Sequence, residues 1–143
     1  VHGVFWREAY KYVNNANAVI EGLSNSTSLS GSTRTQLEGE AKFIRAFCHF
    51  YLVNLFGDIP YVTTTDYQKN STSVRLNATE VYTKIISDLT DAKTLLAADY
   101  SFSNGERSQP NRFAAIALLA RVYLYTGRWA EAESEASAII DNT

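Results

Sequence analysis

The sequence predicts an all-α fold of antiparallel helix pairs packed in tetratricopeptide-like fashion. Apolar residues recur every three or four positions through most of the 143-residue chain, which is the period of an amphipathic helix. No segment shows the strict apolar and polar alternation of a half-buried strand. Near the C-terminus two helical segments meet at Gly127, as they do in a tetratricopeptide-like helix–turn–helix unit. We therefore expect about five helices and two long loops in a single domain over residues 1–143.

The first helix is expected from about Val4 to Leu23. Its predicted inward positions are Ala9, Val13, Ala16, Ile20 and Leu23. Asn17 is flanked by alanines and is the asparagine of this helix that looks most structural, because asparagine is a mediocre helix former and needs a compensating contact. A loop rich in Ser, Thr and Gly follows. The second helix should then start near Thr33, where Thr33-x-x-Gln36 fits a capping box.

The stretch Gly39–Phe56 is expected to be the central buried helix, since it carries two apolar stripes. The stripes are Leu37, Ala41, Ile44, Cys48, Tyr51 and Leu55, and Phe43, Phe47, Phe50, Val53 and Phe56. Ile44 and Phe47 are predicted to lie in the core, where truncation to alanine is costly. Gly57 should end the helix in a left-handed conformation, and Pro60 should prevent its continuation.

A third helix is predicted from the cap pattern Asn77-x-x-Glu80 to about Ala98. Its expected inward positions are Val81, Ile85, Leu89, Ala92 and Leu96. On either side of it lie two irregular segments, residues 61–76 and 99–109, without helical periodicity. Long loops in compact domains are usually functional or disordered.

The last two helices form one unit around Gly127. Ala120 and Ala132 are small enough to let two antiparallel helices approach closely, and Trp129 is expected to pack across the turn against Tyr123 or Leu119. Glu131, Glu133 and Glu135 alternate along the final helix and predict a solvated face.

Composition and residue spacing disfavour several classes of function. A net charge of −2 leaves no basic excess for nucleic acid or an anionic membrane surface, and the longest apolar run is too short to span a bilayer. His49 stands among aromatic residues and is expected to be a satisfied core residue. Cys48 is expected to behave as a small buried hydrophobe. Two distant histidines and one cysteine do not form a metal site, so we expect no enzyme, no metal and no cofactor.

Two segments closely resemble the SusD/RagB family of glycan-binding outer-membrane lipoproteins. The first has the family's Gly-Glu-Ala opening and Leu-Phe-Gly-Asp-hydrophobic-Pro exit, in register at Gly39, Glu40, Ala41, Phe43, Ile44, Arg45, Ala46, Leu55, Phe56, Gly57, Asp58 and Pro60. The second is the alanine-rich helix that begins after Asn111 and ends Ala-Arg-Val-Tyr-Leu-Tyr-Thr-Gly at Gly127. The chain begins without methionine, so it is expected to be an internal fragment that corresponds to the N-terminal part of the family.

The resemblance implies a non-catalytic role in nutrient uptake at the outer membrane. The full-length protein would be lipid-anchored at the cell surface, bind a glycan or oligosaccharide, and work with a SusC-like TonB-dependent outer-membrane transporter. A free-standing helical repeat module for protein–protein interaction is the alternative reading of the same helices.

Aromatic residues in the irregular segments are the candidate ligand-binding groups. Sugars bind flat aromatic faces, with Asn, Asp and Arg holding their hydroxyls. Tyr67 with the neighbouring Asp66, and Tyr100 with Phe102, lie in loops where exposure is expected. The alternative for each ring is that it packs its loop down onto the helices.

Overall fold

A computed structural model describes residues 2–141 and confirms the all-α fold. Within that range it contains α1 (His2–Asn25), α2 (Gly31–Phe56), α3 (Tyr67–Ser71), α4 (Ala78–Leu95), a single 3-10 turn η1 (Ser101–Ser103), α5 (Arg112–Tyr125) and α6 (Trp129–Ile140). No strand occurs among these residues. An isolated antiparallel bridge joins Ile59 and Leu76.

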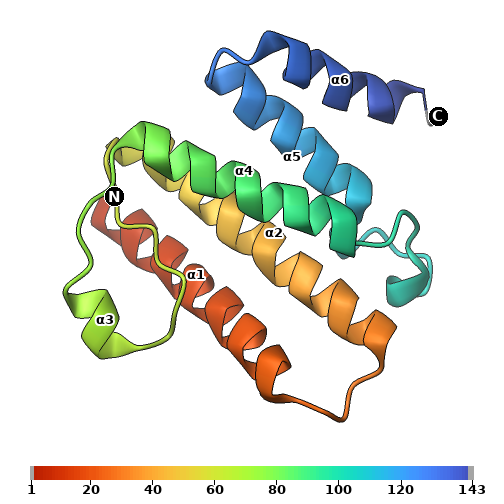
Figure 1. The fold of residues 1–143 in the computed structure, drawn as a ribbon, viewed down its shortest axis with the longest axis horizontal. Helices are drawn as coiled ribbons and strands as arrows, with labels where there is room; N and C mark the ends of the chain where they lie inside the picture. Colours follow the sequence, from red (N-terminus) through yellow and green to blue (C-terminus); the bar gives the residue numbers. More distant parts are fainter. Residues whose placement is uncertain (1, 142–143) are drawn as a thin grey trace.

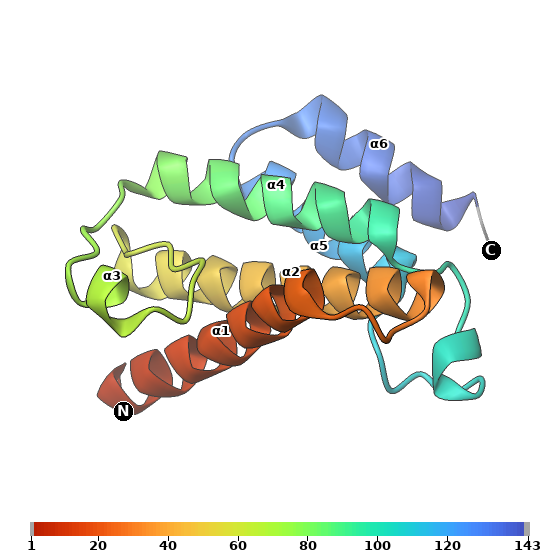
Figure 2. The same ribbon diagram turned by 60° about the horizontal axis from the view of Figure 1, so that its bottom comes forward.

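The five long helices pack one after another in chain order (Figure 1). Helix α2 lies between α1 and α4, α5 packs against α4, and α6 packs against α5. Figures 1 and 2 both place α3, on the segment between α2 and α4, at one end of the stack, and the η1 turn at the opposite end. Packing of each helix mainly on its sequence neighbours is the arrangement of tetratricopeptide-like repeats.

Two helix starts differ in how well the sequence predicted them. Asn77 caps α4 as expected, because its side chain accepts a hydrogen bond from the Glu80 backbone N–H. Helix α2 begins earlier than predicted: Ser30 is the cap, and it accepts from the Thr33 backbone N–H. Gln36, expected in a capping box, is instead buried and accepts a hydrogen bond from the Ala97 N–H at 3.0 Å.

Helices α2 and α4 approach closely at Gly39. A Cβ placed on Gly39 would lie 2.9 Å from Leu96 Cγ and 3.0 Å from Leu95 Cβ, so only glycine fits there without movement of α4. At the other end of α2, Gly57 has φ 71° and ψ −126°. The positive φ was expected, but the ψ value is not that of the left-handed helical region, so the predicted conformation is wrong in that respect.

The core lies along the shared faces of α1, α2 and α4. All five predicted inward positions of α4 are fully buried, as are Val13 of α1 and Leu52 of α2. The prediction that both apolar stripes of α2 are buried is wrong: Ile44 is 40% exposed and Phe47 is 43% exposed. Since α1 and α4 cover two sides of α2, the apolar residues on its remaining side, such as Ile44 and Phe47, are only partly covered within residues 2–141.

The α5–α6 unit also differs from expectation in its aromatic packing. Gly127 turns the chain with φ 72°, and Tyr123 and Ala132 are buried. Trp129, however, is 65% exposed, and the Arg128 guanidinium lies over the Tyr123 ring in its place, 4.4 Å from the ring centroid.

Helix α6 is also tied to α4 by a charged pair. Glu135, predicted to lie on a solvated face, turns toward α4 and accepts from Lys93 Nζ at 2.7 Å. Packing against α4 and α5 therefore decided the orientation of these side chains.

Candidate functional site

Residues 57–77 form an excursion between α2 and α4 that is fastened at both of its ends. Ile59 and Leu76 exchange backbone hydrogen bonds of 3.2 and 3.0 Å. The Asp58 carboxylate accepts from the Ala78 backbone N–H at 3.0 Å. The excursion contains α3, which the sequence did not predict, and Asp66 caps it by accepting from the Gln68 and Lys69 N–H groups. The excursion is therefore an ordered segment that hydrogen bonds fix to the helices.

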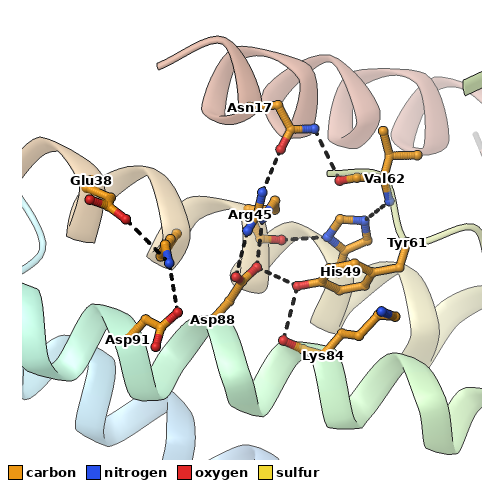
Figure 3. A network of polar contacts seen from close by, with 10 residues as sticks. Asn17, Glu38, Arg45, His49, Tyr61, Val62, Lys84, Asp88 and Asp91 are labelled. Atoms are coloured by element: carbon orange, nitrogen blue, oxygen red, sulfur yellow. Dashed lines mark hydrogen bonds and ion pairs between the residues drawn. The ribbon is translucent and has the colours of Figure 1, made fainter. Parts of the chain in front are cut away.

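A buried polar cluster lies beneath the excursion (Figure 3). Arg45 of α2 donates from Nε and Nη2 to the two oxygens of Asp88 on α4, both at 2.7 Å. Its Nη1 donates to Asn17 Oδ1 of α1 at 2.9 Å. All three side chains are buried, and a bidentate guanidinium–carboxylate pair is the geometry that offsets the loss of solvation best. The cluster joins α1, α2 and α4 at one point.

Asn17 and Tyr10 of α1 bind the backbone of the excursion. Asn17 Nδ2 donates to the carbonyl oxygens of Val62, at 3.1 Å, and Thr64, at 3.4 Å. The Tyr10 hydroxyl donates to the Pro60 carbonyl at 2.7 Å, and burial raises the pKa of Tyr10. The expectation that Asn17 is structural is confirmed. Its hydrogen bonds to Arg45 and to the excursion backbone compensate for its poor helix propensity.

His49 completes the cluster in one defined tautomer. Its Nδ1 lies 2.9 Å from the Arg45 carbonyl oxygen, and its Nε2 lies 3.3 Å from the Val62 backbone nitrogen, whose N–H donates to it. The proton of the neutral ring is therefore on Nδ1. The Tyr61 ring stacks on the imidazole with centroids 3.9 Å apart. Burial lowers the pKa of His49 to about 4, so the ring is neutral, and the expectation of a satisfied core histidine is confirmed.

Glu21, near the end of α1, binds the middle of the excursion. Its carboxylate accepts from the Thr65 hydroxyl, from the Thr65 N–H at 3.0 Å and from the Thr64 hydroxyl at 2.8 Å. These bonds, that of the Thr65 hydroxyl first, lower the pKa of Glu21. The Asn70 side chain of α3 donates to the Thr64 carbonyl at 2.7 Å.

A cleft of about 290 Å³ opens between the first half of α1 and this excursion. It is lined by Trp6, Tyr10, Asn14, Pro60, Val62 and Asn70. The Trp6 ring packs against two other rings: its centroid lies 4.9 Å from that of Tyr10 and 5.0 Å from that of Phe56, whose plane is perpendicular to the indole. Aromatic surface and two carboxamides thus meet in one shallow depression beside a fixed backbone.

The structure separates the four residues that the sequence nominated. Tyr67 is 82% exposed at the start of α3, beside its cap Asp66. Tyr100 and Phe102 lie by η1 at the opposite end of the helix stack (Figures 1 and 2). There Arg107 stands over the Tyr100 ring, 5.7 Å from its centroid, and Phe102 is half exposed. The two pairs therefore do not share one site.

Sequence reasoning missed the residues that line the cleft from α1. Trp6, Tyr10 and Asn14 are spaced four apart and therefore lie on one helix face. This spacing was a readable signal, but their nearness to Asn70 arises only from the tertiary fold.

Comparison with known proteins places this architecture in a family. A SusD-like family model described as "Starch-binding associating with outer membrane" matches residues 2–124. The chain belongs to the SusD-like family. SusD-like protein P2 of Formosa agariphila is 37% identical over 142 residues, which cover 96% of this chain and 27% of that relative.

Solved SusD-like structures have the same fold. A SusD-like protein from Bacteroides fragilis superposes with a TM-score of 0.86 at 28% identity, over 95% of this chain and 26% of that one. A laminarin-binding SusD-like protein superposes with a TM-score of 0.84 at 27% identity, over 92% and 28%. The chain thus spans about a quarter of the length of these SusD-like relatives.

Residues that carry the SusD-like resemblance hold the site together in this chain. Gly39 permits the contact of α2 with α4, Arg45 is the centre of the buried cluster, and Asp58 fastens the excursion to the start of α4. Within residues 2–141, no helix is long and apolar enough to cross a bilayer. Among the same residues, no three His, Cys, Asp or Glu side chains are grouped as metal ligands.

Proposed function

We propose that this chain is one helical unit of a longer, lipid-anchored protein of the outer membrane, which captures glycans at the cell surface without catalysis. The observation that carries the proposal is the match of residues 2–124 to a SusD-like family described by starch binding and outer-membrane association. A solved neighbour that is named for laminarin binding supports the glycan as ligand. In this proposal the protein passes its glycan to a SusC-like TonB-dependent transporter.

The proposal divides the roles of the chain between two surfaces. The excursion and its cleft are held rigidly by Arg45, Asn17 and His49 and offer the aromatic and amide groups that suit sugars. The α5–α6 unit at the other side of the stack offers exposed side chains, among them Trp129 and Glu133, for contact with the transporter. A rigid surface loses little conformational entropy when it binds, which favours binding of a ligand that makes few contacts.

The test uses the full-length protein that contains this chain. We expect calorimetry to show saturable binding of laminarin oligosaccharides or soluble starch, and no release of reducing sugar on long incubation. Absence of binding to any polysaccharide in a broad panel, or steady hydrolysis, would contradict the proposal.

The transporter contact is tested by charge reversal on α6. We expect Glu133→Lys to weaken co-purification of the transporter from membranes. Glu133 is exposed, and reversal of its charge would place a repulsive charge in an electrostatically complementary interface. Glu106→Lys, at an exposed position in the 99–109 loop, is the matched control. Equal co-purification of the Glu133→Lys variant and the wild type would show that this face is not used. Arg128 is unsuited to such a test, since it pairs with Glu131 and covers Tyr123.

A further inference from the structure

We propose that the cleft between α1 and the excursion is a carbohydrate subsite for an uncharged pyranose residue. Trp6 is its apolar wall, Asn14 and Asn70 bind hydroxyl groups, and Tyr67 borders it. This inference rests on the proposed function of glycan capture and adds the location and the ligand class.

The apolar wall has the chemistry that a pyranose ring requires. One face of such a ring presents mainly C–H groups, which pack favourably against the electron-rich face of an indole or phenol. Trp6 is held in place by ring contacts with Tyr10 and with Phe56. The ring therefore does not have to be ordered when ligand arrives, which removes part of the entropic cost of binding.

The two carboxamides stand on opposite sides of the cleft, one on α1 and one on α3. Asn14 is exposed, and its side chain makes no hydrogen bond with residues 2–141, so both its carboxamide oxygen and its carboxamide nitrogen are available. Asn70 is oriented by its bond from Nδ2 to the Thr64 carbonyl, which leaves Oδ1 as an acceptor. A carboxamide can donate to one sugar hydroxyl and accept from another, so this pair can hold hydroxyls at two edges of a ring.

Tyr67 is not among the residues that line the cleft, and we place it at the rim through its neighbour Asn70. It lies three residues before Asn70 on α3, so the two side chains are neighbours on one helix face. Asn70 lines the cleft, and Tyr67 is 82% exposed. A ring that is so exposed at the border of an aromatic cleft is suited to stack on the next sugar of an oligosaccharide.

Charge decides the class of sugar. None of the six side chains that line the cleft carries a charge at neutral pH, because the pKa of the Tyr10 hydroxyl is raised by burial and this hydroxyl donates to the Pro60 carbonyl. Arg75 acts electrostatically on Tyr10, but it is not part of the lining. Without a cation in the lining to pair with a carboxylate or sulfate, the cleft favours a neutral hexose polymer over a uronate polymer.

The far wall of the cleft is fixed by the buried cluster. Pro60 and Val62 belong to the lining, and their carbonyl oxygens are bound by Tyr10 and Asn17. The same backbone is held on its other side by His49, which accepts from the Val62 N–H. The shape of the cleft is thus set before ligand binds.

The test measures binding of laminarin and of soluble starch by the full-length protein and its variants. We expect the affinity for at least one of these neutral glucans to fall roughly threefold to tenfold in Asn14→Ala and Tyr67→Ala, the range of a single hydrogen bond or stacking contact. Trp6→Ala should lose at least tenfold. Asn15→Ala and Tyr12→Ala are matched controls, since both residues are exposed on α1 but line the α1–α2 clefts instead; they should bind as the wild type does.

Each outcome bears on the proposal separately from the proposed function. If the wild type binds glucan and Asn14→Ala, Tyr67→Ala and Trp6→Ala all retain its affinity, the subsite is overturned while glycan capture stands. If the wild type binds alginate, a uronate polymer, in preference to both neutral glucans, the assigned ligand class is overturned. If it binds no glycan at all, the proposed function fails and this inference with it. Because Trp6→Ala also removes packing, its melting temperature is measured alongside, and Asn14→Ala and Tyr67→Ala, whose side chains are exposed, decide the question if it unfolds.

Discussion

The pairing of Arg45 with Asp88 is the contact on which the largest number of others depends. The guanidinium binds both oxygens of the carboxylate and also Asn17, while Tyr61 donates to Asp88 Oδ2 at 2.5 Å. Every member is satisfied, and among residues 2–141 no buried side-chain polar atom lacks a hydrogen-bond partner. A network of this kind rigidifies its surroundings because any partial loss leaves an unpaired buried group.

We predict that Asp88→Asn lowers the free energy of unfolding by about 3–5 kcal/mol, the usual cost of leaving a buried charge without its partner. The measurement is chemical denaturation followed by circular dichroism. Asp91→Asn is the control, because the Asp91 side chain is half exposed and its pair with Lys42 at 2.7 Å lies at the surface; it should cost less than about 1 kcal/mol. Equal losses in the two variants would contradict the prediction.

His49 makes stability depend on pH in a definite direction. Burial lowers its folded-state pKa to about 4 from an ordinary 6.5, and the Arg45 charge acts in the same direction while the Arg45 carbonyl and Asp88 oppose it. Between pH 4 and pH 6.5, His49 is therefore protonated in the unfolded chain and neutral in the folded chain. Stability is full above pH 6.5 and falls as the pH drops toward 4, by on the order of 3 kcal/mol.

We expect His49→Gln to remove most of that slope between pH 6.5 and 5, a range that lies above the ordinary pKa of a carboxyl group, about 4. The wild type and the variant are compared by denaturation at several pH values. The comparison concerns the slope alone, so any difference between the two proteins in stability at neutral pH does not affect it. Parallel slopes would show that His49 is not the group that titrates.

At the scale of elements, the contact of α2 with α4 decides how the excursion is held. The two helices touch at Gly39, and further along α2 the Arg45–Asp88 pair joins them again. Any separation of the helices would pull Asp88 from Arg45 and loosen the excursion above them.

Gly39→Ala tests this close approach. Its Cβ would meet the Leu95 and Leu96 side chains, so we predict a loss of about 1–3 kcal/mol from overpacking. Gly22→Ala is the matched control, since Gly22 also lies within a helix but a Cβ there meets nothing within 4 Å; it should stabilise by about 0.4–1 kcal/mol. Thermal melts of the two variants should shift in opposite directions, and a stabilising Gly39→Ala would disprove the close contact.

At the scale of the whole molecule, two apolar surfaces remain partly exposed within residues 2–141. One runs along α1 and α2 and includes Phe5, Tyr12, Ile44 and Phe47, and the half-buried Cys48 lies in it. The other, on α5 and α6, includes the exposed Leu124 and Trp129, which line one shallow cleft. Repeat stacks need capping units with polar outer faces to remain soluble.

We therefore expect the isolated 143-residue chain to self-associate as its concentration rises. Sedimentation velocity should show a shift toward larger species, and Phe47→Lys should reduce it by placing a charge on the α1–α2 surface. Val74→Lys, at an exposed position of the excursion, is the control and should leave association unchanged. A monomer at every concentration tested would contradict the expectation.

The sequence alone determined the features that depend on local order. Helical periodicity, the Asn77 cap and the turn at Gly127 predicted the elements, because each is specified by residues within a few positions of one another. The inward face of α4 was predicted in full, since α4 has one apolar stripe and one packed side. The two family segments predicted membership of the SusD-like family, and the match to residues 2–124 confirms it.

Only the tertiary structure decided which of several apolar faces is covered. Helix α2 is apolar on more sides than its neighbours occupy, so its sequence could not show that Ile44 and Phe47 stay exposed while Arg45 is buried. Trp129 and Arg128 are adjacent, and the turn geometry placed the cation, not the indole, on Tyr123. The cleft arises in the same way: Asn14 and Asn70 are 56 positions apart in sequence, and the buried Arg45 cluster brings their helices together because a charge removed from water must gather its partners from wherever they lie in the chain.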